Sequence, residues 1–226
     1  MATNPIALNL RRLRIAKGLT QEGIAAKSGL SRAAYRKLES GESEPRVSTL
    51  QEIAGTLRVN IQDLVAPARE FTAVRFRSLK RLRSREQILV QVARWLADFN
   101  ELEGILDDKV EYRLAKFGFR GRPSMDHAVQ MAARVREHLG IGGDEPIRDI
   151  CGLLEAQGIK VGPVPTASQG FFGLSVAPSD GGPAIVVNTW DRISVERWIF
   201  TAAHEFGHLV LHLADYDVRQ TDETEE

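Results

Sequence analysis

The N-terminal part of the chain carries apolar side chains at helical spacing, in short runs separated by glycines and polar residues. The first run contains Ile6, Leu10 and Leu13, and Gly18 ends it. Residues of the types that favour helix N-caps precede the later runs, at Thr20, Ser31, Ser48 and Asn60. The pattern predicts a domain of five short helices over residues 1–66.

Residues 67–85 interrupt this pattern and are predicted to form a basic linker. Within the linker, the stretch TAVRFRS alternates apolar and polar positions as a short strand does. The sequence leaves open whether this stretch packs on the next domain, stays in solvent or contacts DNA.

Residues 86–140 return to helical spacing and are predicted to form a helical connecting region. The apolar stripe of its first helix consists of Ile88, Val92, Trp95, Phe99, Leu102 and Leu106. A second helix follows Pro123 with Ser124 as its cap, and its inward positions are Val129, Ala132, Val135 and Leu139. This pair of helices is suited to contacts in a homodimer.

Residues 141–226 predict a small α+β domain. A helix starts at Pro146 and ends at Gly158. Three strands follow, in IKVGPV, FFGLSVAP and GPAIVVNT. Ser194 then caps a long helix that reaches His212. The expected fold is therefore mainly α in the first domain and α+β, with a three-stranded sheet, in the last.

The net charge of zero conceals two oppositely charged halves. Residues 1–85 carry 17 Lys and Arg against 7 Asp and Glu, a net charge of +10, and residues 86–226 carry 13 against 23, a net charge of −10. A basic first half suits a polyanionic partner. The one cysteine, Cys151, fits a reducing compartment. Because neither a signal peptide nor a membrane-spanning run is visible, we expect a cytoplasmic location without membrane contact.

The helices that Thr20 and Ser31 cap are joined by a tight turn at Gly29, which is the organisation of a helix-turn-helix. In that motif the N-terminal end of the second helix enters the major groove. The candidate DNA-binding residues are therefore Gln21, Ser31, Arg32, Tyr35, Arg36 and Arg46. The alternative is a helical domain with a solvated basic face.

The stretch LRRLRIAKGLTQEGIAAKSGLSRAAYRKLESGESEPRVSTLQEIAGTLRV resembles the Cro/cI-like (Xre) helix-turn-helix family. The matching marks are T-Q-x-x-x-A, S-G-L-S, and L-E-S-G followed by a proline. Gly23 departs from the family, which usually has an acidic residue there. The resemblance implies a lambda-repressor-like fold and a double-stranded DNA operator as partner.

The segment IFTAAHEFGHLVLH, residues 199–212, places ionisable side chains in a helix with apolar residues on every side. Such a helix is predicted to be buried all round, and buried charges are normally paired or bound to metal. His204 and His208 lie one turn apart and can bind one Zn²⁺ ion. Glu205 is placed to act as general base on a zinc-bound water, as in H-E-x-x-H peptidases. The alternative is a pair of core histidines with other hydrogen-bond partners.

The stretch GFFGLSVAPSDGGPAIVVNTWDRISVERWIFTAAHEFGHLVLH looks like the ImmA/IrrE family of metallopeptidase domains. The resemblance implies a zincin-like fold, His204 and His208 as zinc ligands, Glu205 as base and a repressor protein as substrate. In the family a glutamate on a further helix is the third ligand. That helix does not occur before Glu226, so the chain looks cut just before it and the third ligand stays open. The candidates that follow His212 are Asp215, Asp217, Asp222, Glu223, Glu225 and Glu226.

Two hypotheses of function follow. The first is a DNA-binding transcriptional regulator with a zinc metallopeptidase module that hydrolyses a peptide bond in a regulatory protein. The alternative is a transcription factor without catalysis, whose metallopeptidase-like domain senses a metal or a small ligand. A toxin–antitoxin fusion is a third interpretation.

Overall fold

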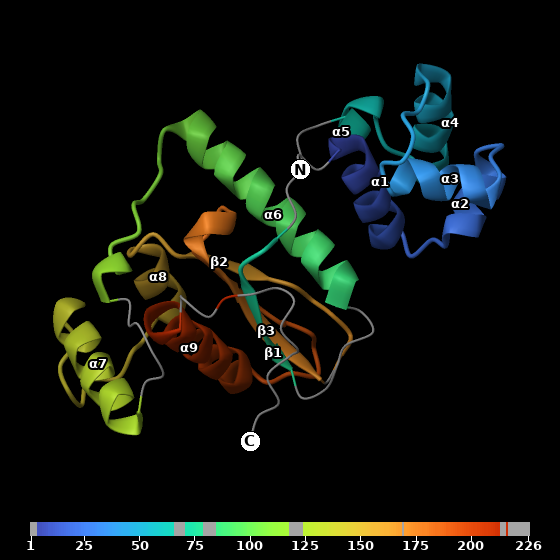
Figure 1. Cartoon of the computed structure of the whole chain (residues 1–226). Helices are drawn as coiled ribbons and strands as arrows, with labels where there is room; N and C mark the ends of the chain where they lie inside the picture. Colours follow the sequence, from blue (N-terminus) through green and yellow to red (C-terminus); the bar gives the residue numbers. More distant parts are fainter. Residues whose placement is uncertain are drawn as a thin grey trace. The chain divides into compact units, whose positions relative to one another are not determined.

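The computed structural model describes residues 4–65, 71–78, 85–117, 124–168, 170–212 and 216. The chain divides into two compact units (Figure 1). The first comprises Met1–Glu70 with Ser84–Ala93, and the second Phe71–Arg83 with Arg94–Glu226. Among the described residues, no helix combines the length and the hydropathy that crossing a membrane requires.

The first unit contains the five helices that the sequence predicts. They are α1 (Pro5–Ala16), α2 (Gln21–Lys27), α3 (Arg32–Glu39), α4 (Val47–Leu57) and α5 (Ile61–Val65). Two of the predicted caps are confirmed, because the Thr20 hydroxyl accepts a hydrogen bond from the Gly23 N–H and the Ser31 hydroxyl accepts one from the Ala34 N–H. The prediction for Ser48 is wrong. Helix α4 begins at Val47, two residues before the first helical residue that a Ser48 cap implies, which places Ser48 inside the helix.

The core of the first unit is apolar apart from a few anchored polar groups. Its fully buried members include Leu10, Ile24, Tyr35, Ile53 and Leu64. The Asn9 side-chain amide donates to the Leu64 carbonyl at 3.1 Å and so ties the first helix to the last. This bond satisfies a buried polar group that would otherwise be costly to desolvate.

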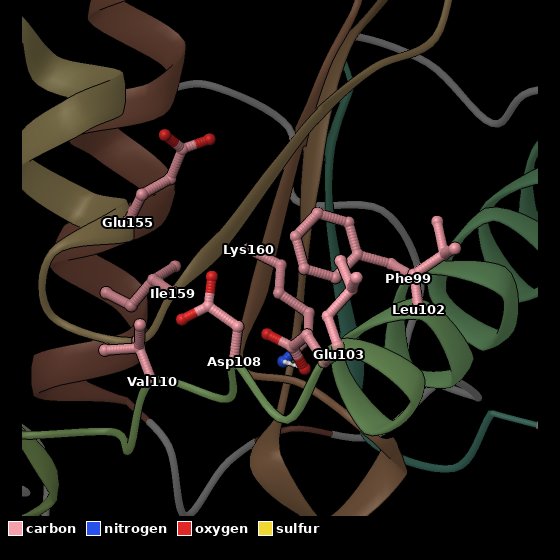
Figure 2. A pocket seen from close by; sticks show the side chains of 10 residues that line it. Phe99, Leu102, Glu103, Asp108, Val110, Glu155, Ile159 and Lys160 are labelled. Atoms are coloured by element: carbon pink, nitrogen blue, oxygen red, sulfur yellow. Dashed lines mark ion pairs between the residues drawn. The ribbon is translucent and has the colours of Figure 1, made fainter.

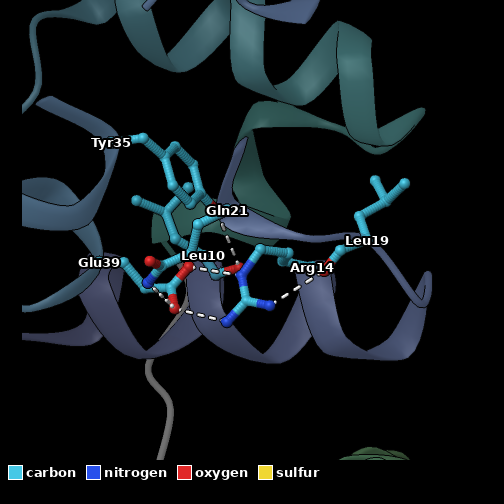
Figure 3. Close-up of polar contacts among 6 residues, drawn as sticks. All are labelled: Leu10, Arg14, Leu19, Gln21, Tyr35 and Glu39. Carbon is cyan, nitrogen blue, oxygen red and sulfur yellow. Dashed lines mark hydrogen bonds and ion pairs between the residues drawn. The ribbon is translucent and has the colours of Figure 1, made fainter. Parts of the chain in front are cut away.

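An ion pair between Arg14 and Glu39 joins the first helix, α1, to the C-terminal end of α3 (Figure 3). Arg14 donates through Nε and Nη2 to the two Glu39 carboxylate oxygens, at 2.7 and 2.6 Å. Its Nη1 donates to the Leu19 carbonyl at 3.0 Å, and Gln21 Nε2 donates to Glu39 Oε1 at 3.1 Å. Because both side chains are largely buried, removing one partner would leave an uncompensated charge.

The first unit is expected to lose stability at acidic pH through Glu39. Burial raises the pKa of Glu39, but hydrogen bonds from Arg14 and Gln21 and the Arg14 charge lower it overall, below its ordinary value of 4.5. A lowered folded-state pKa gives stabilisation that is present above that ordinary value and is lost as the pH falls through the folded-state pKa. The free energy of unfolding, measured with urea, should therefore fall between pH 7 and 3. This fall should be smaller in Glu39→Gln. An identical pH dependence in both proteins would contradict the prediction.

The second unit is built on a four-stranded sheet in the order β1-β3-β4-β2. Its strands are β1 (Val74–Ser78), β2 (Lys160–Pro163), β3 (Phe171–Val176) and β4 (Ala184–Val187). Strand β3 pairs antiparallel with β1 and β4, whereas β2 and β4 run parallel. The three strands predicted for the last domain are confirmed. The expected three-stranded sheet is corrected to four, because TAVRFRS forms the edge strand β1 and packs on this unit.

The remaining elements of the second unit are helical. They are the C-terminal part of α6 (Arg85–Leu106), η1 (Ala115–Phe117), α7 (Met125–His138), α8 (Ile150–Glu155), η2 (Pro178–Asp180) and α9 (Val195–Leu211). The predicted caps Ser124 of α7 and Ser194 of α9 are confirmed by their hydrogen bonds to the third helical N–H. The predicted start at Pro146 is wrong. Helix α8 begins at Ile150, because the Asp149 carboxylate caps it by accepting from the Gly152 N–H at 3.0 Å.

Two glycines let helices approach the two faces of the sheet. A Cβ added to Gly162 of β2 would lie 2.5 Å from the Trp95 ring of α6, and one added to Gly173 of β3 would lie 2.6 Å from Thr201 of α9. Gly162 pairs with Val186, whereas Gly173 pairs with the next residue of β4. Because neighbouring residues of a strand point to opposite faces, α6 and α9 cover opposite faces of the sheet.

Several residues expected in the core are exposed. In α6 the buried stripe includes Ile88 and Val92 as predicted, but Leu102 and Leu106 are 57% and 70% exposed. Helix α9 is not buried all round, contrary to the prediction. The sheet covers only one of its sides, and Phe200 on another side is 57% exposed.

Candidate nucleic-acid interface and metal-binding site

The helix-turn-helix is formed by α2, a turn and α3. Gly29 adopts a φ of +66° in the turn, a left-handed conformation that glycine adopts without strain. The Ser28 hydroxyl donates to the Thr56 hydroxyl of α4 at 2.9 Å and fixes the turn to the rest of the unit. The turn that precedes α3 is therefore tied to α4.

Most of the residues predicted to contact DNA are exposed at or near α3. Ser31, Arg32, Arg36 and Arg46 are all exposed. Arg32 and Arg36 lie one helical turn apart and share a face. Lys37, which the sequence analysis did not select, is also exposed on α3. The sequence signal for Lys37 was its place next to Arg36 in a helix that carries several basic residues.

Tyr35 and Gln21 differ from the other candidates. The prediction that Tyr35 contacts DNA is wrong: its side chain is fully buried, and its hydroxyl donates to the Leu10 carbonyl at 3.5 Å. Burial and the Glu39 charge raise the pKa of Tyr35, so the phenol stays protonated. Gln21 is half-buried and donates to Glu39, and its contact with phosphate stays a prediction.

The H-E-x-x-H segment lies in α9, as predicted. The Nε2 atoms of His204 and His208 are 3.0 Å apart, so the two imidazoles converge on one point. His208 is buried and His204 half-buried. On the other side of the His208 ring, its Nδ1 lies 3.0 Å from Nδ1 of His212.

Glu205 is fully buried and faces the sheet. Its Oε2 accepts a hydrogen bond of 2.6 Å from the Ser175 hydroxyl of β3. Ser175 in turn accepts a bond of 2.8 Å from the Tyr216 hydroxyl. Neither hydroxyl residue is among those predicted from the sequence. A serine inside the apolar strand FFGLSV was a signal for Ser175, but the contact with Tyr216 had none.

The acidic residues considered for a third metal ligand lie outside the described residues: Asp215, Asp217, Asp222, Glu223, Glu225 and Glu226. Within the described part of the chain, no group of three or more His, Cys, Asp or Glu side chains is arranged to hold a metal ion. Zinc binding therefore stays a prediction.

A family model and several known proteins are similar to part of this chain. The helix-turn-helix family model matches residues 10–64. The uncharacterized HTH-type transcriptional regulator y4dJ of Sinorhizobium fredii is 45% identical over 65 residues, which are 29% of this chain and 84% of that protein. The chain belongs to the helix-turn-helix family of transcriptional regulators.

Two further proteins are similar to part of the chain. The HTH-type regulator RghRB of Bacillus subtilis is 36% identical over 66 residues, 29% of this chain and 48% of that protein. The crystal structure of the restriction-modification controller protein C.AhdI of Aeromonas hydrophila is 33% identical, with a TM-score of 0.27, and the match covers 27% of this chain and 92% of that one.

His212 is expected to control zinc affinity in this helix-turn-helix protein. Because Nε2 of His208 faces His204, the partner of its Nδ1 fixes the tautomer and the ring orientation. His212→Ala should weaken zinc binding about 10–100-fold, as losses of such outer partners do. Competition with a chromophoric chelator measures this. His138→Ala, an exposed histidine of α7, is the control, and equal affinities in the two variants would refute the role of His212.

Proposed function

We propose that this helix-turn-helix regulator binds a double-stranded DNA operator with its first unit and cuts a regulatory protein, such as a repressor, with a zinc-dependent peptidase in its second unit. The observation that carries the peptidase half is the convergence of the His204 and His208 Nε2 atoms, 3.0 Å apart, beside the buried carboxylate of Glu205. The resemblance to ImmA/IrrE domains supports the same assignment.

The residues present fit a zinc ion. Two ligands at the usual Zn–N distance of about 2.0–2.1 Å lie about 3.3 Å apart around a tetrahedral ion, close to the separation of the two imidazole nitrogens. His204 and His208 would hold the ion. When bound, zinc supplies Lewis-acid activation of water and of a peptide carbonyl.

The role of the chain's own side chains follows from their environment. Glu205 follows His204 directly and takes up a proton as general base. Burial strengthens its interactions, because the local dielectric is low. The half-exposed Phe200 ring, with its centroid 6.4 Å from that of His204, offers an apolar surface for a substrate side chain next to the histidines.

The operator half of the proposal uses the N-terminal end of α3 as the major-groove reader. Arg32 and Arg36 would contact bases or phosphates, and Ser31 and Arg46 the backbone. The proposed assembly is a homodimer, because such proteins read two half-sites. The exposed Leu102 and Leu106 of α6 offer an apolar surface for a second copy.

The experiment combines zinc analysis of the purified chain with a quenched-fluorescent peptide library. We expect the purified chain to contain zinc, and His204→Ala and His208→Ala to lose it. We also expect a chelator to stop cleavage and added zinc to restore it. Cleavage that persists after both histidines are replaced would overturn the zinc mechanism.

A second candidate function, ligand sensing without catalysis, is favoured by a pocket of about 420 Å³ in the second unit (Figure 2). Its apolar lining includes Phe99, Leu102 and Ile159. Lys160 Nζ lies 3.1 Å from Glu103 Oε2 in a buried ion pair at the pocket. A mostly apolar hollow with a few polar groups is typical of small-molecule sites. Zinc binding without any cleavage would favour this candidate.

A further inference from the structure

Two hydroxyl groups from distant parts of the chain form a chain of hydrogen bonds that ends at the carboxylate of Glu205. Tyr216, which follows α9, donates to the Ser175 hydroxyl at 2.8 Å, and Ser175 donates to Glu205 Oε2 at 2.6 Å. Glu205 and Ser175 are fully buried, and Tyr216 is 9% exposed. We call this arrangement the hydroxyl relay.

The direction of the relay follows from counting protons. Each hydroxyl has one proton, so Ser175, which donates to the carboxylate, has to accept from Tyr216. Burial and the charge of Glu205 raise the pKa of Tyr216, which keeps its hydroxyl protonated and able to donate. The Ser175–Glu205 distance of 2.6 Å is that of a short hydrogen bond. The two bonds therefore form one chain from Tyr216 through Ser175 to Glu205.

The relay also fixes the orientation of Glu205. Ser175 lies two residues from Gly173 on β3, so both point to the face that α9 covers. The Glu205 carboxylate accepts this hydrogen bond through Oε2, so it cannot rotate about its Cγ–Cδ bond without losing the contact with Ser175. A general base acts efficiently only when it is held in place before the reaction.

We propose that Ser175 and Tyr216 are positioning residues, which hold Glu205 in the orientation that proton abstraction requires. This inference rests on the proposed peptidase function. It assigns a role in that function to a strand serine and to a tyrosine beyond the H-E-x-x-H helix.

A double-mutant cycle tests the relay without using activity. Tyr216→Phe removes one hydroxyl, and its effect on urea unfolding of the full chain, with and without zinc, is compared in wild-type and Glu205→Gln backgrounds. In the wild-type background we expect Tyr216→Phe to lower the folding equilibrium constant about tenfold. In the Glu205→Gln background we expect at most about a threefold loss, because hydrogen bonds in a charged network are stronger. Tyr35→Phe, which removes the hydroxyl of a fully buried tyrosine in the first unit, is the control and should show the same effect in both backgrounds.

Cleavage of the peptide-library member that the wild type cuts best supplies the second readout. Tyr216→Phe should lower kcat about tenfold with KM and zinc content unchanged, and Ser175→Ala should lower it at least as far. Ser175→Thr, which keeps the hydroxyl, should restore most of the rate.

The outcomes separate the relay from the peptidase. Equal effects of Tyr216→Phe in the two backgrounds, or an unchanged kcat, overturn the positioning role. Coupling to Glu205 without any cleavage by the wild-type chain overturns the proposed function and with it the catalytic meaning of the relay, while the hydrogen-bonded relay itself stands.

Discussion

Glu205→Gln is expected to lower the rate of peptide-bond cleavage about 10²–10⁴-fold, the usual contribution of a general base. Glutamine keeps the shape of the side chain and can still accept a bond from Ser175, but it cannot take up the proton. Zinc content should stay unchanged, because the proposed ligands are His204 and His208. Single-turnover cleavage and zinc analysis of the same preparation measure both quantities.

Glu196→Gln is the matched control for this variant. Glu196 lies on the exposed first turn of the same helix, so the control makes the same chemical change outside the site. It should cleave at the wild-type rate. Equal cleavage by wild type and Glu205→Gln would remove Glu205 as base, and loss of zinc from Glu205→Gln would show that the change disturbs the histidines instead.

Arg36→Ala is expected to weaken operator binding by about 1–3 kcal/mol, or about 5–150-fold, if the guanidinium contacts a base. Loss of a phosphate contact would instead weaken binding to all sequences alike. It would also reduce the slope of log affinity against log salt concentration by about one. The operator is first selected from random double-stranded DNA, and affinity is then measured at several salt concentrations.

Arg94→Ala provides the control for the lost charge, because Arg94 is an exposed arginine of the second unit. Its affinity for DNA should match that of the wild type, and so should that of Glu205→Gln. Weaker binding by Glu205→Gln than by Arg36→Ala would refute the assignment of DNA binding to the first unit.

Local signals in the sequence predicted the first unit well. Thr20 and Ser31 act through hydrogen bonds to residues three positions away, and such contacts are visible in a short stretch of sequence. Tyr35 shows the limit of this reasoning. It lies in a basic, exposed-looking helix, yet the phenol enters the core because α1 and α3 pack together through Leu10.

The candidate metal site was predictable only in part. The spacing of His204 and His208 dictates their convergence, since a helix places residues four apart on one face. Ser175 and Tyr216 are 30 and 41 residues from their partners, so sheet pairing and tertiary packing decide those contacts. The exposed side of α9 was mispredicted for the same reason: apolar composition alone does not say how many faces a sheet will cover.

The alternation of the chain between its two units has a consequence for any proteolytic cut between them. The polypeptide leaves the first unit at Glu70, contributes the edge strand β1 to the sheet of the second, and returns as Ser84–Ala93 to the first. No single scission between residues 70 and 94 could therefore release both halves intact. A cut before Phe71 would separate Ser84–Ala93, ten residues of the first unit, from the rest of that unit. A cut after Ala93 would separate β1 from the second unit, and β3 would become an edge strand able to pair with another molecule.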